Sequence, residues 1–421
     1  MGWNRNSPHR VSLQAECPTS VRCRKLLDTL FLIAAKWPPE YGGPGIYYKR
    51  HLRHVARIAR HVRIVAWTRG GAIDLSEAPA NVTAVPVSTP RGRFSAHIAG
   101  IRMAFRLLRE VRKAEGRAGI LFTGGSVSIG WRPTAVCMRY AGVPVLVENV
   151  LFRADDGESL RRARWPGLTS WSAGCLRAFC PVSLGLLASV RKAFPHATSV
   201  HLPYGVDLAE NAPVEPARRA TARAAINAEH ATFVATSFGA IHSRKGQLPL
   251  VDAWLRWVRR SGCIGARLFI VGPPSDTAYL AAIHSLLQES SDAVANTVVF
   301  TGFCADVRPF LRAADVYMSA AFAEGLPISI VEALAHGVPV VCRKLEGVTN
   351  DFLRGHAVTA VEDWEADAVG SSLDILSDAT ARAVASHDAR AAAEERFDIE
   401  KRMSIIRQLL MLDDPLPTSA A

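Results

Sequence analysis

Two successive series of alternating strands and helices, separated by a proline-containing segment, constrain the fold of this chain most strongly. Such alternation predicts parallel sheets whose strands are buried on both faces and therefore appear as short apolar runs. A chain of 421 residues is also too long for a single hydrophobic core, so we expect two domains. The segment 211–216, which holds two prolines, is the expected linker.

The apolar runs and helical repeats place the elements within each series. The expected strands are residues 29–35, 62–67, 82–87, 120–123, 143–147 and 178–182, then 232–237, 267–271, 297–301, 316–319 and 339–342. In the first series one helical pattern places Leu52, Val55, Ile58 and Val62 on one face, and a second helix at 98–113 repeats apolar residues at Ile98, Ile101, Phe105 and Leu108. In the second series the helices are expected around 248–260, 279–289, 307–313 and 328–336. A last helix at 399–411 follows the completed second series, and packing back across the first domain is one option for it.

The charge of the chain is unevenly distributed. The net charge of +12 is the sum of +17 over residues 1–210 (30 Lys and Arg against 13 Asp and Glu) and −5 over residues 211–421 (20 against 25). A basic half indicates a polyanion or an anionic membrane surface as partner, and arginine-rich solvated helices are the alternative. No apolar run approaches the roughly 20 residues of a spanning helix. The basic start resembles a signal peptide poorly, since Asp28 interrupts its apolar run and Lys36 and Trp37 follow it. We therefore expect a cytoplasmic protein.

The segment with the clearest chemistry holds Glu324 and Glu332. A strand ends near Ser319, Pro327 starts a helix where its missing N–H does no harm, and Gly337 ends that helix. Both carboxylates then lie at the carboxyl edge of the sheet, where open α/β folds bind ligands.

Carboxylates beside a helix N-terminus suit a sugar nucleotide. The glutamates accept hydrogen bonds from ribose and hexose hydroxyls, and the free amides of Gly325, Leu326 and Ile328 favour a diphosphate. The alternative is a pair of surface glutamates that stabilise the helix through its dipole.

At this point the sequence resembles the family 4 retaining glycosyltransferases of the GT-B fold, in which two Rossmann-like domains face a central cleft. The spacing of Glu324 and Glu332, with Ala-x-Gly-x-Pro-Val after them, looks like the family signature. Segments 239–246 (GAIHSRKG), 203–207 (PYGVD), 180–183 (CPVS), the glycines at 42–43 and the closing helix at 397–410 also resemble family segments. The implied organisation is a loose extension at 1–24, an acceptor domain at 25–208, a donor domain at 209–396, and a closing helix and tail at 397–421.

The resemblance implies roles for individual residues. Lys245 would neutralise the donor diphosphate, and Gly42 and Gly43 would offer amides from across the cleft. Glu324 would contact the transferred sugar and Glu332 the ribose. The fold class implies no cofactor and no metal ion, and the sequence has no strand-edge Asp-x-Asp that would hold one.

The sequence departs from the family at three places. Ala240 stands where the family has arginine, and the adjacent Arg244 is a substitute, although neighbouring residues generally point in different directions. No histidine stands at the cleft end of 147–150, where Glu148 and Asn149 are candidates for contacts with the acceptor or the sugar. The alternative for these two is a polar strand end facing solvent. The loop 346–350 ends in Asn350 rather than glutamate.

Two basic helices suggest a docking surface. Their basic residues are Lys49, Arg50, Arg53, Arg57 and Arg60, then Arg102, Arg106, Arg109, Arg112 and Lys113. They suit the inner face of an anionic membrane and a lipid-linked acceptor. Nucleic acid is not expected, because aromatic residues do not alternate with these cations.

The expected function is transfer of a sugar from a nucleotide-diphosphate sugar to a saccharide or lipid-linked acceptor, in cell-envelope polysaccharide or glycolipid synthesis. Two alternatives stay open: a catalytically inactive GT-B scaffold, and a sugar-nucleotide epimerase or hydrolase. A dehydrogenase is excluded, because no Gly-x-Gly-x-x-Gly follows a strand with an acidic residue at ribose distance.

Overall fold

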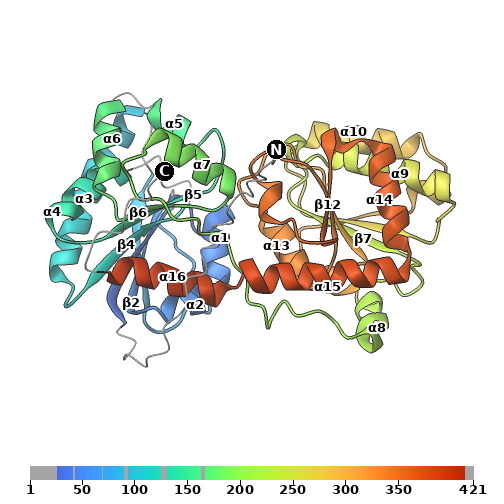
Figure 1. Ribbon diagram of the computed structural model, residues 1–421, viewed down its shortest axis with the longest axis horizontal. Helices are drawn as coiled ribbons and strands as arrows, with labels where there is room; N and C mark the ends of the chain where they lie inside the picture. The colour runs from blue at the N-terminus through green and yellow to red at the C-terminus, as the bar shows by residue number, and fades with distance from the viewer. Residues whose placement is uncertain are drawn as a thin grey trace, which may run out of the picture.

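The computed structural model describes residues 26–40, 43–68, 70–89, 93–124, 130–162 and 166–412. Two six-stranded sheets lie side by side in Figure 1, each flanked by helices. Every strand pair in both sheets is parallel. The predicted GT-B class is therefore confirmed at the level of architecture.

The first domain is built on a sheet of order β3-β2-β1-β4-β5-β6. Its elements are β1 (Leu27–Ala34), α1 (Gly43–Arg50), α2 (Leu52–Ala56), β2 (Ala59–Thr68), β3 (Val82–Ser88), α3 (Arg93–Lys113), β4 (Ala118–Phe122), α4 (Trp131–Tyr140), β5 (Val145–Asn149), α5 (Gly157–Arg161), α6 (Pro166–Gly174), β6 (Ala178–Pro181) and α7 (Leu184–Ala193). The crossovers from β3 to β6 all run in one direction, which places α3, α4 and α6 on one face of the sheet.

The second domain repeats this plan with the order β12-β11-β10-β7-β8-β9. Its elements are η2 (Pro216–Arg218), α8 (Arg219–Ala224), β7 (Val234–Phe238), η3 (Ser243–Lys245), α9 (Gln247–Ser261), β8 (Arg267–Val271), α10 (Thr277–Gln288), α11 (Asp292–Ala295), β9 (Val298–Gly302), α12 (Arg308–Ala313), β10 (Val316–Ser319), α13 (Ile328–Ala335), β11 (Val340–Arg343), η4 (Thr349–Asp351), β12 (Val358–Val361), η5 (Glu362–Trp364), α14 (Ala366–Ser377) and α15 (Ala379–Arg396). All five residues of the central strand β7 are buried, as a parallel sheet covered on both faces requires.

The last helix, α16 (Ile399–Met411), leaves the second domain and lies on the first, against α2 and β1 (Figure 1). Its Arg402 is fully buried and contacts the Glu148 carboxylate at the end of β5. The same guanidinium donates to the hydroxyl of Tyr48 at 3.2 Å and to the carbonyl of Pro203 at 2.7 Å. One side chain thus joins the closing helix, α1, β5 and the segment between the domains.

Of the two helices predicted in the first domain, one is wrong in extent and the other is confirmed. The expected helix through Val62 ends at Ala56, and Val62 lies in β2, because two short helices precede a strand that begins at Ala59. The helix predicted at 98–113 is confirmed as α3, but most of its apolar repeat faces outward, with Phe105 62% accessible, whereas Met103 and Leu107 face the sheet. Both stripes have helical spacing, so periodicity alone did not decide which one packs.

Within the described ranges, no helix is long and apolar enough to cross a bilayer. The described cysteines are unpaired thiols. Strand β12 and helices α14 and α15 were not predicted; β12 is a short edge strand whose two middle residues are not buried.

Replacing Arg402 with alanine leaves the Glu148 carboxylate buried without a counter-charge. We expect the free energy of unfolding to fall by about 3–5 kcal/mol. Urea unfolding followed by tryptophan fluorescence measures the change. Gln408→Ala, at an exposed position of the same helix, is the control and should cost less than about 0.5 kcal/mol. Equal unfolding midpoints for the two variants would contradict the anchoring role of Arg402.

Candidate active site

The segment between β10 and α13 places the two glutamates of the signature. Pro327 is the extended residue before α13, and the helix ends at Gly337 with a φ of 67°. Gly337 N–H donates to the carbonyl of Leu334, and Val338 N–H to that of Ala333, each at 2.9 Å. This Schellman ending satisfies the last carbonyls of the helix and turns the chain into β11. Glu324 therefore lies in the loop that leaves the carboxyl end of β10.

Glu324 is held by two cations from the segment after β7. Its Oε1 lies 2.6 Å from Nζ of Lys245 and 3.1 Å from Nη1 of Arg244. Arg244 also donates to the carbonyl of Ala323 at 2.7 Å. The expectation that Arg244 and Lys245 point in different directions is wrong, because the 3₁₀ turn η3 brings both to the same carboxylate.

Close backbone packing fixes this arrangement. Gly246 has a φ of 70°, and a Cβ there would lie 2.1 Å from the carbonyl oxygen of Ala320. The amide of Phe322 donates to the carbonyl of Arg244 at 2.8 Å. Only glycine permits this approach without strain, so the segment carrying Lys245 is held directly against the loop carrying Glu324.

The start of α13 offers backbone donors beside these charges. Among the described residues, none accepts a hydrogen bond from the amides of Gly325, Leu326 and Ile328. Unpaired amides at the start of a helix, together with its dipole, favour an anion. Two cations and these amides therefore give this edge of the sheet the means to hold a diphosphate.

Glu332 lies one turn into α13 and is 8% exposed. Its Oε1 lies 2.5 Å from Nη1 of Arg50, the last residue of α1 in the first domain. Burial raises the pKa of Glu332 above its ordinary value, and the Arg50 guanidinium opposes that shift. The second carboxylate of the signature is thus paired across the domain boundary.

The two domains touch at further points around this pair. A Cβ on Gly325 would lie 1.6 Å from the carbonyl oxygen of Val150. Gly185 donates its amide to the carbonyl of Gly347 at 2.8 Å. The Leu184 amide, at the start of α7, donates to the buried Asp351 carboxylate at 3.0 Å. The described conformation is therefore a closed one.

The acceptor candidates Glu148 and Asn149 are both fully buried, so the alternative that they face solvent is wrong. Glu148 contacts Arg402 and Tyr48, and Asn149 donates to the carbonyl of Asp155 at 2.6 Å. Contact with an acceptor would require this buried network to open. A direct role in acceptor binding stays an untested prediction for both residues.

The glycines expected across the cleft are partly described. Gly42 lies outside the described residues. Gly43 is the exposed first residue of α1, and a Cβ there would meet nothing within 4 Å. Helix α1 therefore begins at Gly43, a candidate for contact with the sugar-nucleotide donor, and ends at Arg50, the partner of Glu332.

Arg50, which the sequence groups with a basic surface, is a residue of the candidate site. Most of that surface is internally paired: Lys49 with Asp74, Arg50 with Glu332, Arg53 with Asp207 and Glu210, Arg57 with Glu400 and Arg60 with Asp28. The pairing of Arg50 with Glu332 joins residues 282 positions apart, and no local pattern signals it.

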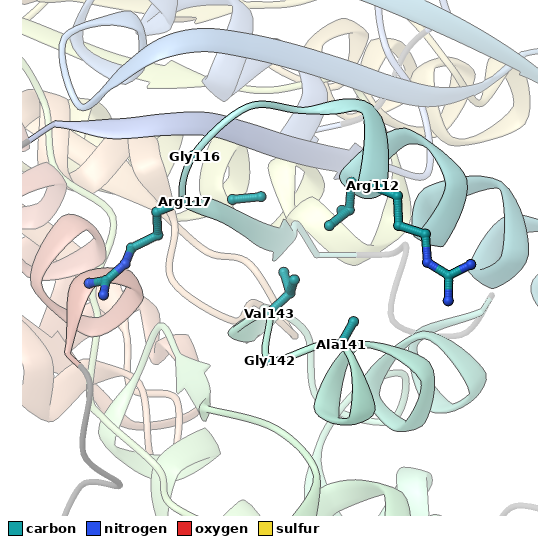
Figure 2. Close-up of a pocket in the computed structure, with 8 residues that line it drawn as sticks. Arg112, Gly116, Arg117, Ala141, Gly142 and Val143 are labelled. Atoms are coloured by element: carbon teal, nitrogen blue, oxygen red, sulfur yellow. The ribbon is translucent and has the colours of Figure 1, made fainter.

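A separate hollow lies at the opposite, amino-terminal edge of the first sheet. Figure 2 shows Arg112 and Arg117 on opposite sides of this space of about 570 Å³, which Val143 and its neighbours line. Arg117 donates to the carbonyl of Met411 at 2.6 Å and so anchors the end of α16. The hollow is far from the carboxyl edges of the strands and is not part of the candidate site.

The sequence of this chain matches a known protein family and two curated relatives. Residues 232–378, which hold Lys245, Glu324 and Glu332, match the family described as glycosyl transferases group 1. Over 194 residues the chain is 33% identical to a GDP-mannose-dependent α-(1-6)-phosphatidylinositol monomannoside mannosyltransferase of Mycolicibacterium smegmatis, covering 44% of this chain and 48% of that protein. A 46-residue stretch is 44% identical to the putative teichuronic acid biosynthesis glycosyltransferase TuaC of Bacillus subtilis, covering 11% and 12% of the two chains. The alignments thus span about half or less of these curated relatives.

Solved structures match over nearly the whole chain. The Anabaena protein HepE in complex with UDP superposes with a TM-score of 0.72 at 18% identity, covering 91% of this chain and 99% of HepE. Sucrose-phosphate synthase from Thermosynechococcus elongatus gives a TM-score of 0.68 at 18% identity, covering 91% and 98%. At this identity the likeness establishes the fold.

The fold and the site define a GT-B protein with charged residues where its two domains meet. The second domain holds the segment that matches the glycosyl transferases group 1, and part of the chain is similar to a mannosyltransferase. The predicted resemblance to the glycosyl transferases group 1 is confirmed, and the assignment to family 4 stays a prediction.

Adding one methyl group at Gly325 should hold the domains apart, because it would clash with the Val150 carbonyl. We expect Gly325→Ala to cost about 1–3 kcal/mol of stability in the closed state. Small-angle scattering should show a larger radius of gyration than for the wild type. Gly167→Ala, where a Cβ meets nothing within 4 Å, is the control. An unchanged radius of gyration for Gly325→Ala would contradict a closed ground state in solution.

Proposed function

We propose that this protein is a retaining glycosyltransferase that moves a hexosyl group from a nucleotide-diphosphate sugar to a saccharide or lipid-linked acceptor in cell-envelope polysaccharide or glycolipid synthesis. The single observation that carries the proposal is the convergence of Lys245 and Arg244 on Glu324 beside the unpaired amides of α13. Retention of configuration rests on the resemblance to family 4.

The proposed chemistry assigns a role to each group. The bond between the sugar C1 and the diphosphate oxygen breaks, and a bond from C1 to the acceptor oxygen forms on the same face. The acceptor proton passes to the departing diphosphate. Lys245, Arg244 and the amides of Gly325, Leu326 and Ile328 stabilise the negative charge that develops there, as preorganised donors do in a closed cleft. Glu324 orients the hexose, and Glu332 accepts hydrogen bonds from the ribose. Gly43 adds an amide from the first domain. No resident cofactor or metal ion takes part in the proposed step.

Two donors are the first to test. The mycobacterial relative depends on GDP-mannose, and its alignment with this chain makes that sugar nucleotide the leading candidate. A UDP-sugar is the second, because the HepE structure of the same fold contains UDP.

We also propose that one face of the first domain docks on the inner surface of an anionic membrane. Helix α3 packs on α4, and α4 on α6. This α3–α4–α6 face exposes the side chains Ile101, Phe105, Tyr140, Leu168 and Trp171, and the cations Arg102, Arg106, Arg112 and Arg139.

The charge on this face is available to a partner. In the described part of the chain, none of its four arginines contacts a carboxylate, unlike the paired cations near α1 and α2. Exposed aromatic rings beside unpaired cations suit the headgroup region of anionic lipid. The proposed docking surface therefore includes the second predicted basic helix, α3, and leaves out the paired basic residues of 49–60.

Removing the cation that faces the diphosphate should slow transfer strongly. We expect Lys245→Ala to reduce turnover about 100- to 1,000-fold, the loss seen when one preorganised donor to a developing charge is removed. A donor panel that includes GDP-mannose and UDP-glucose, with release of nucleoside diphosphate as the readout, measures it. Lys344→Ala, an exposed lysine paired with Glu362, is the control. If no donor yields diphosphate with any acceptor and none raises the melting temperature, the protein is a scaffold rather than a transferase.

Neutralising two arginines of the α3–α4–α6 face should weaken binding to anionic vesicles. Arg102→Gln with Arg106→Gln should cost roughly thirtyfold in affinity, since each cation near such a surface contributes about 1 kcal/mol. Flotation with phosphatidylglycerol vesicles measures binding. Arg57→Gln with Arg60→Gln is the matched control, because those cations pair within the protein. Equal flotation with neutral and anionic vesicles would exclude this docking surface.

A further inference from the structure

We propose that Arg50 is a positioning residue of the donor site. From the first domain it holds the Glu332 carboxylate in place for the donor ribose, so ribose recognition requires the closed arrangement of the domains. This inference rests on the proposed function, in which Glu332 binds the ribose.

Arg50 contacts one carboxylate oxygen of Glu332 and leaves the other available for a ligand. Arg50 Nη1 lies 2.5 Å from Oε1, and within the described chain no residue donates a hydrogen bond to Oε2. The Glu332 side chain is 10% exposed, whereas that of Arg50 is 43% exposed. One oxygen is thus fixed by a charge-assisted contact, and the other remains as an acceptor for a ribose hydroxyl.

Arg50 differs from its basic neighbours in what it reaches. Lys49 and Arg60 pair with carboxylates of the first domain, and Arg57 with Glu400 of the closing helix. Among the described cations of residues 49–60, Arg50 alone contacts a glutamate of the signature in the second domain. Since α1 also starts at Gly43, one short helix would present both an amide and a positioning cation to the donor.

The other charges near Glu332 do not replace Arg50. Asp306 and Arg308, before and at the start of α12, pair with each other at 2.8 Å. Tyr317 of β10 lies close enough for the charge of Glu332 to act on it. On its own helix, His336 contacts the Glu332 backbone carbonyl at 2.9 Å. Without Arg50, the Glu332 carboxylate would keep Asp306 as a repulsive neighbour and Arg308 as a cation already paired.

The sign of the pH effect follows from burial. Burial raises the pKa of Glu332, and Arg50 opposes that rise. A carboxylate that accepts ribose hydroxyls does so when ionised, so this contribution to affinity is lost as the pH falls through its pKa. Removing Arg50 moves that pKa further up, and the loss of affinity should therefore occur at a higher pH than in the wild type.

The experiment compares ribose-containing and ribose-modified nucleotides. GDP and UDP, and their 2′,3′-dideoxy forms, are titrated between pH 5.5 and 8 into the wild type and into Arg50→Ala, Arg50→Lys and Arg60→Ala. Removing the hydroxyls should cost the wild type about tenfold in affinity, the value of a hydrogen bond to a charged group. Arg50→Ala should bind the parent nucleotide about tenfold more weakly, hardly distinguish it from the dideoxy form, and weaken further toward pH 5.5.

The two other variants separate charge from geometry. Arg50→Lys keeps a cation without the planar guanidinium, so it should bind with intermediate affinity and keep the pH profile of the wild type. Arg60→Ala should match the wild type, since Arg60 is a surface cation 3.5 Å from Asp28. Melting temperatures without nucleotide check that each variant is folded.

Two contrary outcomes have different meanings. If the wild type distinguishes ribose from dideoxyribose and Arg50→Ala does so equally at every pH, the positioning role is overturned and the proposed function stands. If the wild type binds neither nucleotide, the proposed function fails and this inference fails with it.

Discussion

The buried pair between Arg402 and Glu148 is the interaction on which the arrangement of the rest depends. An uncompensated charge at either position would be costly in an apolar interior, so neither partner can leave without the other. The pair ties the closing helix to β5, and the contact of both residues with Tyr48 ties it to α1. Arg402 also binds the carbonyl of Pro203, where the chain passes from the first domain to the second. Helix α1 ends at Arg50, which pairs with Glu332 of the second domain. The pair between Arg402 and Glu148 therefore also helps to place Arg50, because it holds Tyr48 of the same helix.

Backbone contacts set how closely the two domains approach. Gly325 lies against the Val150 carbonyl, and Gly185 lies against Gly347, so both contacts exclude a Cβ. Such positions allow the domains to approach further than any side chain would. They carry little attraction of their own, and the hydrogen bond from Gly185 to Gly347 is a modest one. These backbone contacts permit the domains to close but do not hold them closed. The ion pair between Arg50 and Glu332 adds an attractive, charged link between the domains.

Much of the fold could be predicted from the sequence because its signals are local. Buried parallel strands are apolar runs, and a proline before a helix with a glycine after it marks both ends of α13. The same local spacing identified Glu324 and Glu332. What could not be predicted depends on partners distant in sequence: Arg50 with Glu332, and Glu148 with Arg402. Helix α3 itself was predicted, but two stripes of apolar residues share its helical spacing, and tertiary packing against the sheet selected Met103 and Leu107.

The availability of the basic residues also depends on partners that are distant in sequence. A net charge of +17 over residues 1–210 (30 Lys and Arg against 13 Asp and Glu) says how many cations exceed the carboxylates there, but not which cations are available to a partner. Around α1 and α2 the structure places carboxylates beside the basic residues, including Glu400 of the closing helix and Asp207 near the linker. A cation paired in this way gains little from an external anion, because binding would exchange one partner for another. On α3, Arg102 and Arg106 lie beside the exposed Phe105 and contact no described carboxylate. The arginines of the α3–α4–α6 face are therefore available to a partner, while Arg50, Arg53 and Arg57 link the first domain to the second and to the closing helix.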